Sequence, residues 1–190
     1  MDEIRPLYRD WQKARGKRKT KLKETLLRRI WEHYHPRLQT FLASIPREIR
    51  EDRVSEILLT VFESLETYNP DYAFSTWLYR VARNSEVDRF RRKKPQLVEW
   101  EEEIHTPEEK WETPEDIVLR KVEREELVQA METLNPPDRE LLFLTCYEEM
   151  TYKEAGRILG RPEGTVKYEM YRIKKALRKE LTREVCDERA

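Results

Sequence analysis

The chain has 190 residues, 38% of them hydrophobic and 10% aromatic, which suffices for one domain or two small ones and excludes a disordered chain. Its 38 basic and 38 acidic residues cancel overall, but they are distributed in blocks. No apolar run approaches the roughly 18 residues that a membrane span requires. The first residues, MDEIRPLYRDW, also lack the apolar region of a secretory signal. We therefore expect a cytoplasmic protein without membrane insertion.

Residues that could hold metals or perform catalysis are sparse. Cys146 and Cys186 lie forty residues apart, so they offer neither a disulfide framework nor a metal knuckle. The three histidines have no metal-ligand spacing, and no Ser/His/Asp, Cys/His or phosphate-loop arrangement is evident. We expect no metal, no cofactor and no enzyme activity. A metal-dependent nuclease built on the acidic stretch at residues 99–116 is a weaker alternative, because its carboxylates lack the spacing of a two-metal site.

Residues 1–24 form a basic N-terminal extension. The stretch KARGKRKTKLK at 13–23 has seven basic residues and no acid. Such a segment could be an arm that binds DNA phosphates or a disordered start, and we favour the disordered start.

Residues 25–95 are predicted to form a first helical domain. Apolar residues recur every three to four positions over 26–41 and again over 54–65, which is typical of amphipathic helices. The sequence NPDYAFS breaks the pattern, and Ser75 is the expected N-cap of the next helix. The inner face of that helix would carry Leu78, Val81, Ala82 and Ser85. With only four glycines and no strand alternation, the chain is predicted to be all-α.

An acidic extended linker is predicted at residues 96–116, because 99–116 contains nine acids against one lysine and has no helical period. A second helical domain follows at 117–184, and residues 185–190 form a tail. Helices are expected over 117–131 and 138–147. A third should start at Thr151, since Glu154 three residues later completes a capping box.

The sequence TYKEAGRILGRPEGTVKYEMYRIKKAL predicts a helix-turn-helix. Gly160 fits the turn, Pro162 fits the first position of the second helix, and Gly156 fits the close crossing of the two helices. An alternative is an ordinary bundle helix with a solvated basic face. The outward face of the second helix carries Lys167, Tyr168, Tyr171, Arg172, Lys174 and Lys175, which can reach phosphates and base edges.

Two long stretches resemble one known family. FSTWLYRVARNSEVDRFRRKK is similar to the end of region two, and LNPPDRELLFLTCYEEMTYKEAGRILGRPEGTVKYEMYRIKKALRKEL to region four, of bacterial sigma-70 type sigma factors. The resemblance is to the compact extracytoplasmic-function (ECF) group, which has only these two regions. It implies two small helical domains, a region 2 bundle and a region 4 helix-turn-helix. It also implies a protein that directs core RNA polymerase to promoter DNA.

The resemblance also implies which residues bind promoter DNA. Residues 76–94 hold seven Arg or Lys and one Trp, which suits melted DNA because cations bind its phosphates and aromatic rings stack on its bases. By likeness, Asn84 lies in a loop that reads a flipped base, while Trp77 could equally be a core residue. The expected minus-ten set is Trp77, Arg80, Arg83, Asn84, Asp88, Arg89, Arg91 and Arg92. The expected minus-thirty-five set is Thr165, Lys167, Tyr168, Tyr171, Arg172, Lys174 and Lys175.

The chain departs from the family where region two docks on polymerase. The family has a D-x-x-Q-E pattern before a Phe, but this chain has EILLTVF, with Leu59 and Thr60 in place of Gln and Glu. The expected docking residues are Glu56, Leu59, Thr60, Phe62 and Glu63. We hypothesise that phosphorylation of Thr60 by a Ser/Thr kinase restores the missing charge. The alternative is that Thr60 is a neutral substitution and that Leu59 docks by apolar contact.

Other points stay open in the sequence. Glu169 in the second helix of the helix-turn-helix could accept from a cytosine amine or repel phosphate. In the linker, Glu99, Glu101, Glu102 and Glu103 could mimic nucleic-acid charge inside the polymerase or simply stay solvated. An anti-sigma factor is a further expected partner. The rival function is a stand-alone helix-turn-helix regulator that binds duplex DNA without recruiting polymerase.

Overall fold

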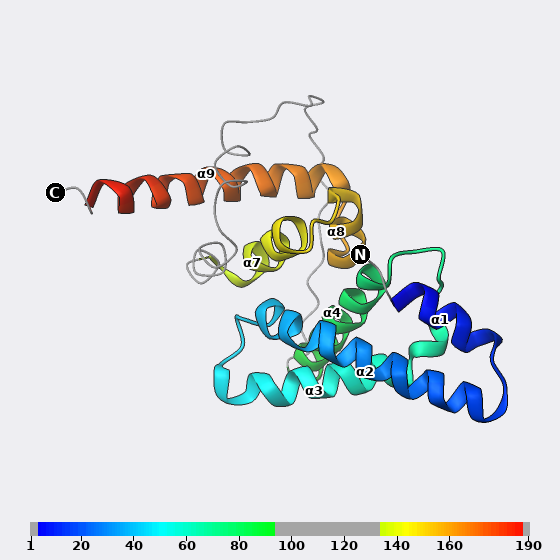
Figure 1. Cartoon of the computed structure of the whole chain (residues 1–190). Coiled ribbons are helices and arrows are strands. Elements are labelled where there is room, and N and C mark those ends of the chain that lie inside the picture. Colours follow the sequence, from blue (N-terminus) through cyan, green and yellow to red (C-terminus); the bar gives the residue numbers. More distant parts are fainter. Residues whose placement is uncertain (1–3, 94–133, 188–190) are drawn as a thin grey trace. The chain divides into compact units, whose positions relative to one another are not determined.

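The computed structural model describes residues 4–93 and 134–187, with side chains described for 4–89 and 134–178. The chain divides into two compact units, Met1–Val98 and Glu99–Ala190 (Figure 1). All regular elements in the described ranges are helical, as predicted. The predicted linker at 96–116 and the predicted helix at 117–131 lie outside the described residues.

The described part of the first unit, residues 4–93, contains four α-helices and one short 3-10 helix. These are α1 (Ile4–Lys13), α2 (Gly16–Phe41), α3 (Arg47–Glu63), η1 (Leu65–Thr67) and α4 (Phe74–Lys93). Helix α2 packs against both α1 and α3, and α3 packs against α4 (Figure 1). In Figure 1 the first turns of α4 and helix α1 flank the segment that follows η1.

The expectation of a disordered start is wrong. Ile4, Tyr8 and Trp11 are buried, and their spacing of four and three places them on one face of α1 against the rest of the unit. Gly16 at φ +56° allows the chain to reverse between α1 and α2. The expected boundary at residue 24 falls inside α2, so the basic stretch at 13–23 is mostly helical and exposed to solvent.

The helices predicted over 26–41 and 54–65 are present and bury their apolar faces. The buried set is Leu26, Ile30, Tyr34, Leu38 and Phe41 on α2, with Val54, Ile57, Leu58 and Val61 on α3 and Leu65 in η1. Trp31 departs from the predicted face. It is 41% exposed and stacks on the ring of His35, 4.9 Å between centroids.

Helix α4 begins one residue before the expected cap. Phe74 is fully buried and is the first helical residue, so Ser75 lies inside the first turn and does not cap it. The amide of Trp77 donates to the carbonyl of Ala73 at 3.4 Å, which makes Ala73 the first acceptor of the helix. The burial of Phe74 against Tyr34 and Tyr68 outweighs the local preference of a serine for the cap position.

The second unit contains α7 (Pro136–Leu142), η2 (Phe143–Tyr147, a π-helix), α8 (Tyr152–Leu159) and α9 (Glu163–Asp187). Asn135 caps α7 by accepting from the amide of Asp138 at 3.0 Å, so the helix begins two residues earlier than expected. The capping box predicted for α8 is present between Thr151 and Glu154. The predicted tail boundary at residue 185 falls inside α9.

Candidate nucleic-acid and polymerase interfaces

Helix α4 separates a buried face from a polar one. Leu78, Tyr79 and Ala82 are fully buried, and the opposite side is open to solvent. Among the predicted minus-ten residues, the exposed ones are Arg80, Asn84 and Asp88, and the half-buried ones are Trp77, Arg83 and Arg89. The side chains of Arg91 and Arg92 lie outside the described set. The polar face is therefore continuous over at least two turns.

Trp77 is neither a fully buried core residue nor a fully exposed one. Its indole packs against the rings of Tyr68 and Phe74, each 5.4 Å away between centroids, yet it is only half-buried. The contacts fix the ring in place while leaving part of its surface accessible. A fixed, partly exposed indole is suited to stacking on an unpaired base.

The assignment of Asn84 to a loop is wrong. Asn84 is exposed in the interior of α4, ten residues after Phe74. The loop of this region comprises residues 68–73, which connect η1 to α4. Asn84 therefore presents its amide from a helix and not from that loop.

The predicted docking residues of α3 form a solvent-exposed surface. Glu56, Thr60 and Glu63 are exposed, Leu59 is 58% exposed and Phe62 is half-buried. The helical period thus points these positions away from the core, as expected from their spacing. The Thr60 hydroxyl donates to the carbonyl of Glu56 at 3.0 Å.

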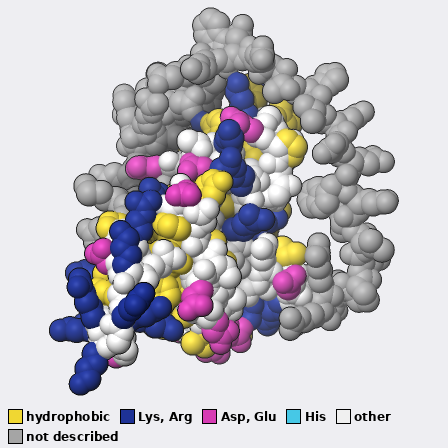
Figure 2. Space-filling model, turned by 90° about the vertical axis from the view of Figure 1, so that its right-hand side faces the viewer, with side chains coloured by type: hydrophobic (Ala, Val, Ile, Leu, Met, Phe, Trp, Pro, Cys, Tyr) yellow, Lys and Arg dark blue, Asp and Glu magenta, His cyan; other side chains and the backbone are white. Residues whose placement is uncertain are grey.

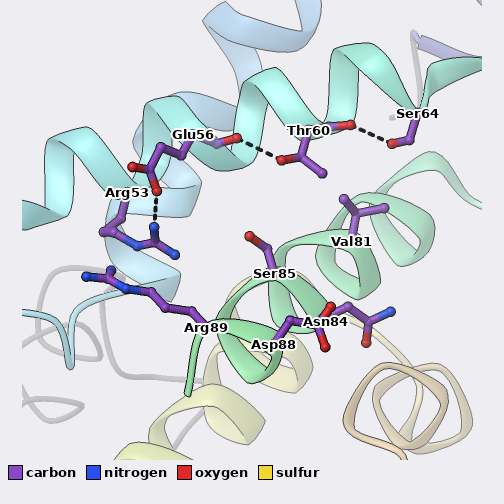
Figure 3. Close-up of a pocket in the computed structure, with 9 residues that line it drawn as sticks. All are labelled: Arg53, Glu56, Thr60, Ser64, Val81, Asn84, Ser85, Asp88 and Arg89. Atoms are coloured by element: carbon purple, nitrogen blue, oxygen red, sulfur yellow. Dashed lines mark hydrogen bonds and ion pairs between the residues drawn. The ribbon is translucent and has the colours of Figure 1, made fainter. Parts of the chain in front are cut away.

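A groove of about 530 Å³ runs between α3 and α4 and brings the two predicted sites together (Figure 3). Sequence reasoning placed these residues in separate surfaces and missed their shared groove. Figure 3 shows side chains of both helices pointing into the space between them. The lining residues are Arg53, Glu56, Thr60 and Ser64 from α3 and Val81, Asn84, Ser85, Asp88 and Arg89 from α4.

Arg53 sits at the end of this groove and was not predicted to matter. It is 8% exposed and forms ion pairs with Glu56 on its own helix and with Glu86 on α4. Its Nε also donates to Glu86 Oε1 at 3.1 Å. The sequence signal that could have identified Arg53 is its position one turn before Ile57, where a charged residue lies on a side of α3 that is otherwise apolar.

The helix-turn-helix of the second unit has the predicted glycines at its turn. Gly160 ends α8 at φ +66°, a left-handed conformation that favours glycine. A Cβ on Gly156 would lie 2.6 Å from the carbonyl oxygen of Arg161 and 3.5 Å from a methyl of Val166, so no larger residue fits there. Pro162 lies one residue before α9 and not at its first position.

The outward face of α9 carries aromatic and basic side chains. Tyr168 is 62% and Tyr171 50% exposed, and Arg172 and Lys175 are exposed as well. Thr165, Lys167 and Lys174 are half-buried. The opposite face is the buried core of the unit, formed by Val166, Met170, Ile173 and Leu177.

The predicted α9 cations include residues that have partners within the unit. Arg172 forms an ion pair with Asp138 at 2.5 Å, and Lys174 donates to the hydroxyl of Tyr152 at 3.2 Å. The open sequence question about Glu169 has an answer in the same unit. It accepts from Arg161 at 2.7 Å and braces the turn between α8 and α9.

Neither a metal cluster nor a membrane span is found in the described part of the chain. No group of three or more His, Cys, Asp or Glu side chains there could hold a metal ion. None of the described helices is both long and apolar enough to cross a bilayer.

Comparisons with known proteins match both units. Residues 30–96 match the family model of sigma-70 region 2, and residues 124–177 match that of sigma-70 region 4, which leaves α1 outside both. The ECF RNA polymerase sigma factor SigW of Bacillus subtilis is 34% identical over 141 residues, 69% of this chain and 74% of SigW. RNA polymerase sigma factor CarQ of Myxococcus xanthus is 28% identical over 152 residues, 78% of this chain and 85% of CarQ.

Solved structures share the fold. The sigma factor RpoE of Bartonella quintana, in complex with the anti-sigma factor NepR, aligns with a TM-score of 0.57 at 18% identity over 82% of this chain and 96% of RpoE. CnrH, in complex with the cytosolic domain of CnrY, aligns with a TM-score of 0.56 at 21% identity over 94% of this chain and 97% of CnrH.

Proposed function

The chain belongs to the ECF group of the sigma-70 family of RNA polymerase sigma factors, and we propose that its two units bind one promoter at two separate elements. As a sigma factor it is a non-enzymatic transcription initiation factor that binds core RNA polymerase and promoter DNA. The proposal assigns the minus-ten element to the first unit, which contains the region 2 match at 30–96, and the minus-thirty-five element to the second unit, which contains the region 4 match at 124–177.

The polar face of α4 is the proposed site for the melted minus-ten element. The observation that carries this assignment is the one-sided arrangement of α4, with cations, an amide and a fixed indole opposite a fully buried face. Melted DNA keeps its phosphate charges and exposes its bases, so a protein that holds it needs cations for the phosphates and ring surfaces for the bases. Arg80, Arg83 and Arg89 would supply the charge and Trp77 the ring.

The outward face of α9 is the proposed site for duplex DNA at the minus-thirty-five element. Tyr168, Tyr171 and Lys175 are the exposed side chains best able to reach it, because Arg172 and Lys174 also have partners within the unit. We assign Glu169 no part in base reading, since its carboxylate is held by Arg161. A recognition helix enters the major groove with such residues facing the base edges.

The exposed face of α3 is the proposed polymerase docking surface, and Thr60 is the proposed site of its control. A phosphate on Thr60 would add about −1.5 to −2 charge to a surface that already carries Glu56 and Glu63. Because Arg53 is engaged with Glu56, the unmodified surface presents less negative charge than its composition suggests. Phosphorylation by a Ser/Thr kinase would then raise affinity for a basic surface on the polymerase.

Further partners and location follow from the same assignment. An anti-sigma factor is proposed to cover the exposed α3 face, since RpoE of Bartonella quintana, which shares this fold, forms a complex with the anti-sigma factor NepR. A factor that works with core polymerase on promoter DNA acts in the cytoplasm of a bacterium. The exposed basic residues at 13–23 are suited to an additional contact with DNA phosphates, and the acidic residues at 99–103 to a channel of the polymerase.

A transcription assay tests the proposal. The full chain, with and without kinase treatment, is mixed with purified core polymerase and promoter fragments selected from a random library. Promoter-specific transcripts that require both the chain and core polymerase are expected. The rival function, a stand-alone helix-turn-helix regulator, leaves the α4 face without a role. It would be favoured if the chain binds DNA but does not associate with core polymerase, whether or not it is phosphorylated.

A further inference from the structure

Helix α1 is bonded directly to the loop that precedes the DNA helix. The hydroxyl of Tyr8 donates to the carbonyl of Tyr68 at 3.1 Å, and Arg9 Nη2 donates to the carbonyl of Pro70 at 3.3 Å. Gln12 Nε2 donates to the Tyr8 hydroxyl at 3.0 Å and so orients that hydroxyl for its own donation. Two successive residues of α1 thus hold alternate carbonyls of the segment at 68–73.

The same segment is also fixed from within. The hydroxyl of Tyr68 donates to the carbonyl of Tyr72 at 2.8 Å, and the amide of Asp71 donates to Asn69 Oδ1 at 2.9 Å. Together with the bonds from α1, these contacts engage the carbonyls at positions 68, 70 and 72. A loop held at so many points has little freedom left to lose when it binds a ligand.

The ring of Tyr68 connects α1 to the start of α4. Its centroid lies 4.9 Å from the ring of Tyr8, 5.0 Å from that of Phe74 and 5.4 Å from that of Trp77. Tyr8 and Phe74 are fully buried, so this aromatic cluster is part of the core of the unit. A displacement of α1 would therefore be transmitted to the loop and to the indole of Trp77.

Tyr72 is the member of the loop that faces outward. It is 56% exposed, although large aromatic side chains are normally covered. Its backbone is fixed through Tyr68 while its ring remains open to solvent. A rigidly mounted, exposed ring at the entrance to a DNA-binding helix is suited to stacking on an unpaired base.

We propose that α1 is a positioning element for promoter melting: through Tyr8 and Arg9 it holds the loop at 68–73 so that Tyr72 stacks on a base released from the duplex. This inference rests on the proposed function of α4. Tyr8 and Arg9 are positioning residues, because they act through the loop, and Tyr72 contacts the base. The exposed stretch at 13–23, which begins at the last residue of α1 and has seven basic residues and no acid, favours a nucleic-acid ligand. Figure 2 shows Lys and Arg side chains gathered toward the lower left of one face of the molecule, with Asp and Glu side chains elsewhere on it.

The experiment measures the unpairing of promoter DNA by the reconstituted holoenzyme. Full-length variants are combined with core polymerase on a promoter selected from a random library, and unpaired thymines are detected by permanganate. The variants are Tyr72→Ala, Tyr8→Phe and Arg9→Ala, with Lys13→Ala as the control. Lys13 is an exposed cation on α1, so its loss reports the general effect of one fewer positive charge.

We expect Tyr72→Ala to lower the extent of opening by about five- to 150-fold, the range for loss of one base–aromatic stack. Tyr8→Phe and Arg9→Ala should also lower it, and Lys13→Ala should lower it less than Arg9→Ala. Tyr8→Phe should have no further effect in a Tyr72→Ala background, because both changes remove the same stack. Polymerase affinity should be the same for all variants.

Three results would overturn the inference while leaving the proposed function intact. If Tyr72→Ala opens the promoter to the same extent as the wild type, Tyr72 does not stack on an unpaired base. If Arg9→Ala and Lys13→Ala lower promoter opening equally, α1 contributes only positive charge. If the effects of Tyr8→Phe and Tyr72→Ala are additive, α1 does not act through Tyr72 and has only a structural role. Failure of the wild-type holoenzyme to open any promoter would contradict the proposed function, and this inference with it.

Discussion

Arg53 on α3 and Glu86 on α4 form an ion pair that joins the proposed docking helix to the proposed DNA helix. Both side chains are largely buried, at 9% and 13% exposed, and Arg53 also holds Glu56 on the docking face. Removing one member of a buried pair leaves an uncompensated charge. We therefore expect Arg53→Met to lower the free energy of unfolding by about 3–5 kcal/mol, measured by urea denaturation.

The matched control replaces both members of the pair. In Arg53→Met with Glu86→Leu no buried charge is left without a partner, so most of the lost stability should return. If the double variant is as unstable as Arg53→Met alone, the effect of Arg53 lies in its packing and not in the ion pair with Glu86.

Charge at position 60 should control polymerase affinity. Thr60→Glu places a carboxylate where the family has glutamate, and one charge-assisted hydrogen bond changes affinity by roughly tenfold to a hundredfold. We expect Thr60→Glu to bind core polymerase more tightly than the unmodified protein and Thr60→Ala do. The measurement is the dissociation constant for core polymerase.

The control for Thr60 is Thr67→Glu, which adds the same charge at an exposed threonine of η1 outside the docking set. It should leave affinity unchanged. Equal affinities for Thr60→Glu, Thr60→Ala and the unmodified protein would remove the proposed phosphorylation switch while leaving the sigma-factor assignment intact.

Gly156 should tolerate no larger residue. In Gly156→Ala the new methyl would meet the backbone oxygen of Arg161 at 2.6 Å, so the turn between α8 and α9 must move. Overpacking of this kind costs about 1–3 kcal/mol, and the recognition helix would be displaced with the turn. We expect a lower unfolding midpoint and weaker binding to duplex promoter DNA. Arg157→Ala, at an exposed position of α8, should change neither.

The buried phenol of Tyr8 predicts a dependence of stability on alkaline pH. Burial raises the pKa of Tyr8 above its ordinary value of 10.0; the hydrogen bond from Gln12 partly opposes this, and Glu66 adds to it. Because the folded state favours the neutral phenol, its contribution is complete below about pH 10 and declines as the pH rises further. The stability difference between wild type and Tyr8→Phe, measured in urea at several pH values, should shrink above about pH 10. A difference that stays constant would contradict a buried hydroxyl.

The periodic parts of this structure could be predicted from sequence, and the exceptions have physical causes. The apolar spacing on α2 and α3 and the Thr151 capping box were sufficient to predict these helices, because each signal depends only on residues close together in the sequence. Helix α1 could not be predicted because it has only three buried positions, Ile4, Tyr8 and Trp11, which is a short apolar period next to the seven cations at 13–23. The first residue of α4 was missed because burial of Phe74 outweighed the capping preference of Ser75.

The exposure of single residues in the candidate sites was predictable from the sequence, but the contacts between their helices were not. Helical period was enough to place Leu59 and Thr60 on the outside of α3 and Tyr168 on the outside of α9. Contacts between helices depend on how they cross, which a local pattern does not specify. The groove shared by α3 and α4, the Arg53–Glu86 pair and the bonds from Tyr8 to the loop at 68–73 all belong to that class.

A footprint of the reconstituted holoenzyme on a selected promoter tests the central claim most directly. The account predicts two separate protected elements, with unpaired thymines only in the downstream one. Tyr168→Ala with Lys175→Ala should abolish upstream protection, and Trp77→Ala with Arg80→Ala should abolish the unpairing. A single protected site that forms equally without core polymerase, with no unpaired bases at any promoter, would contradict it.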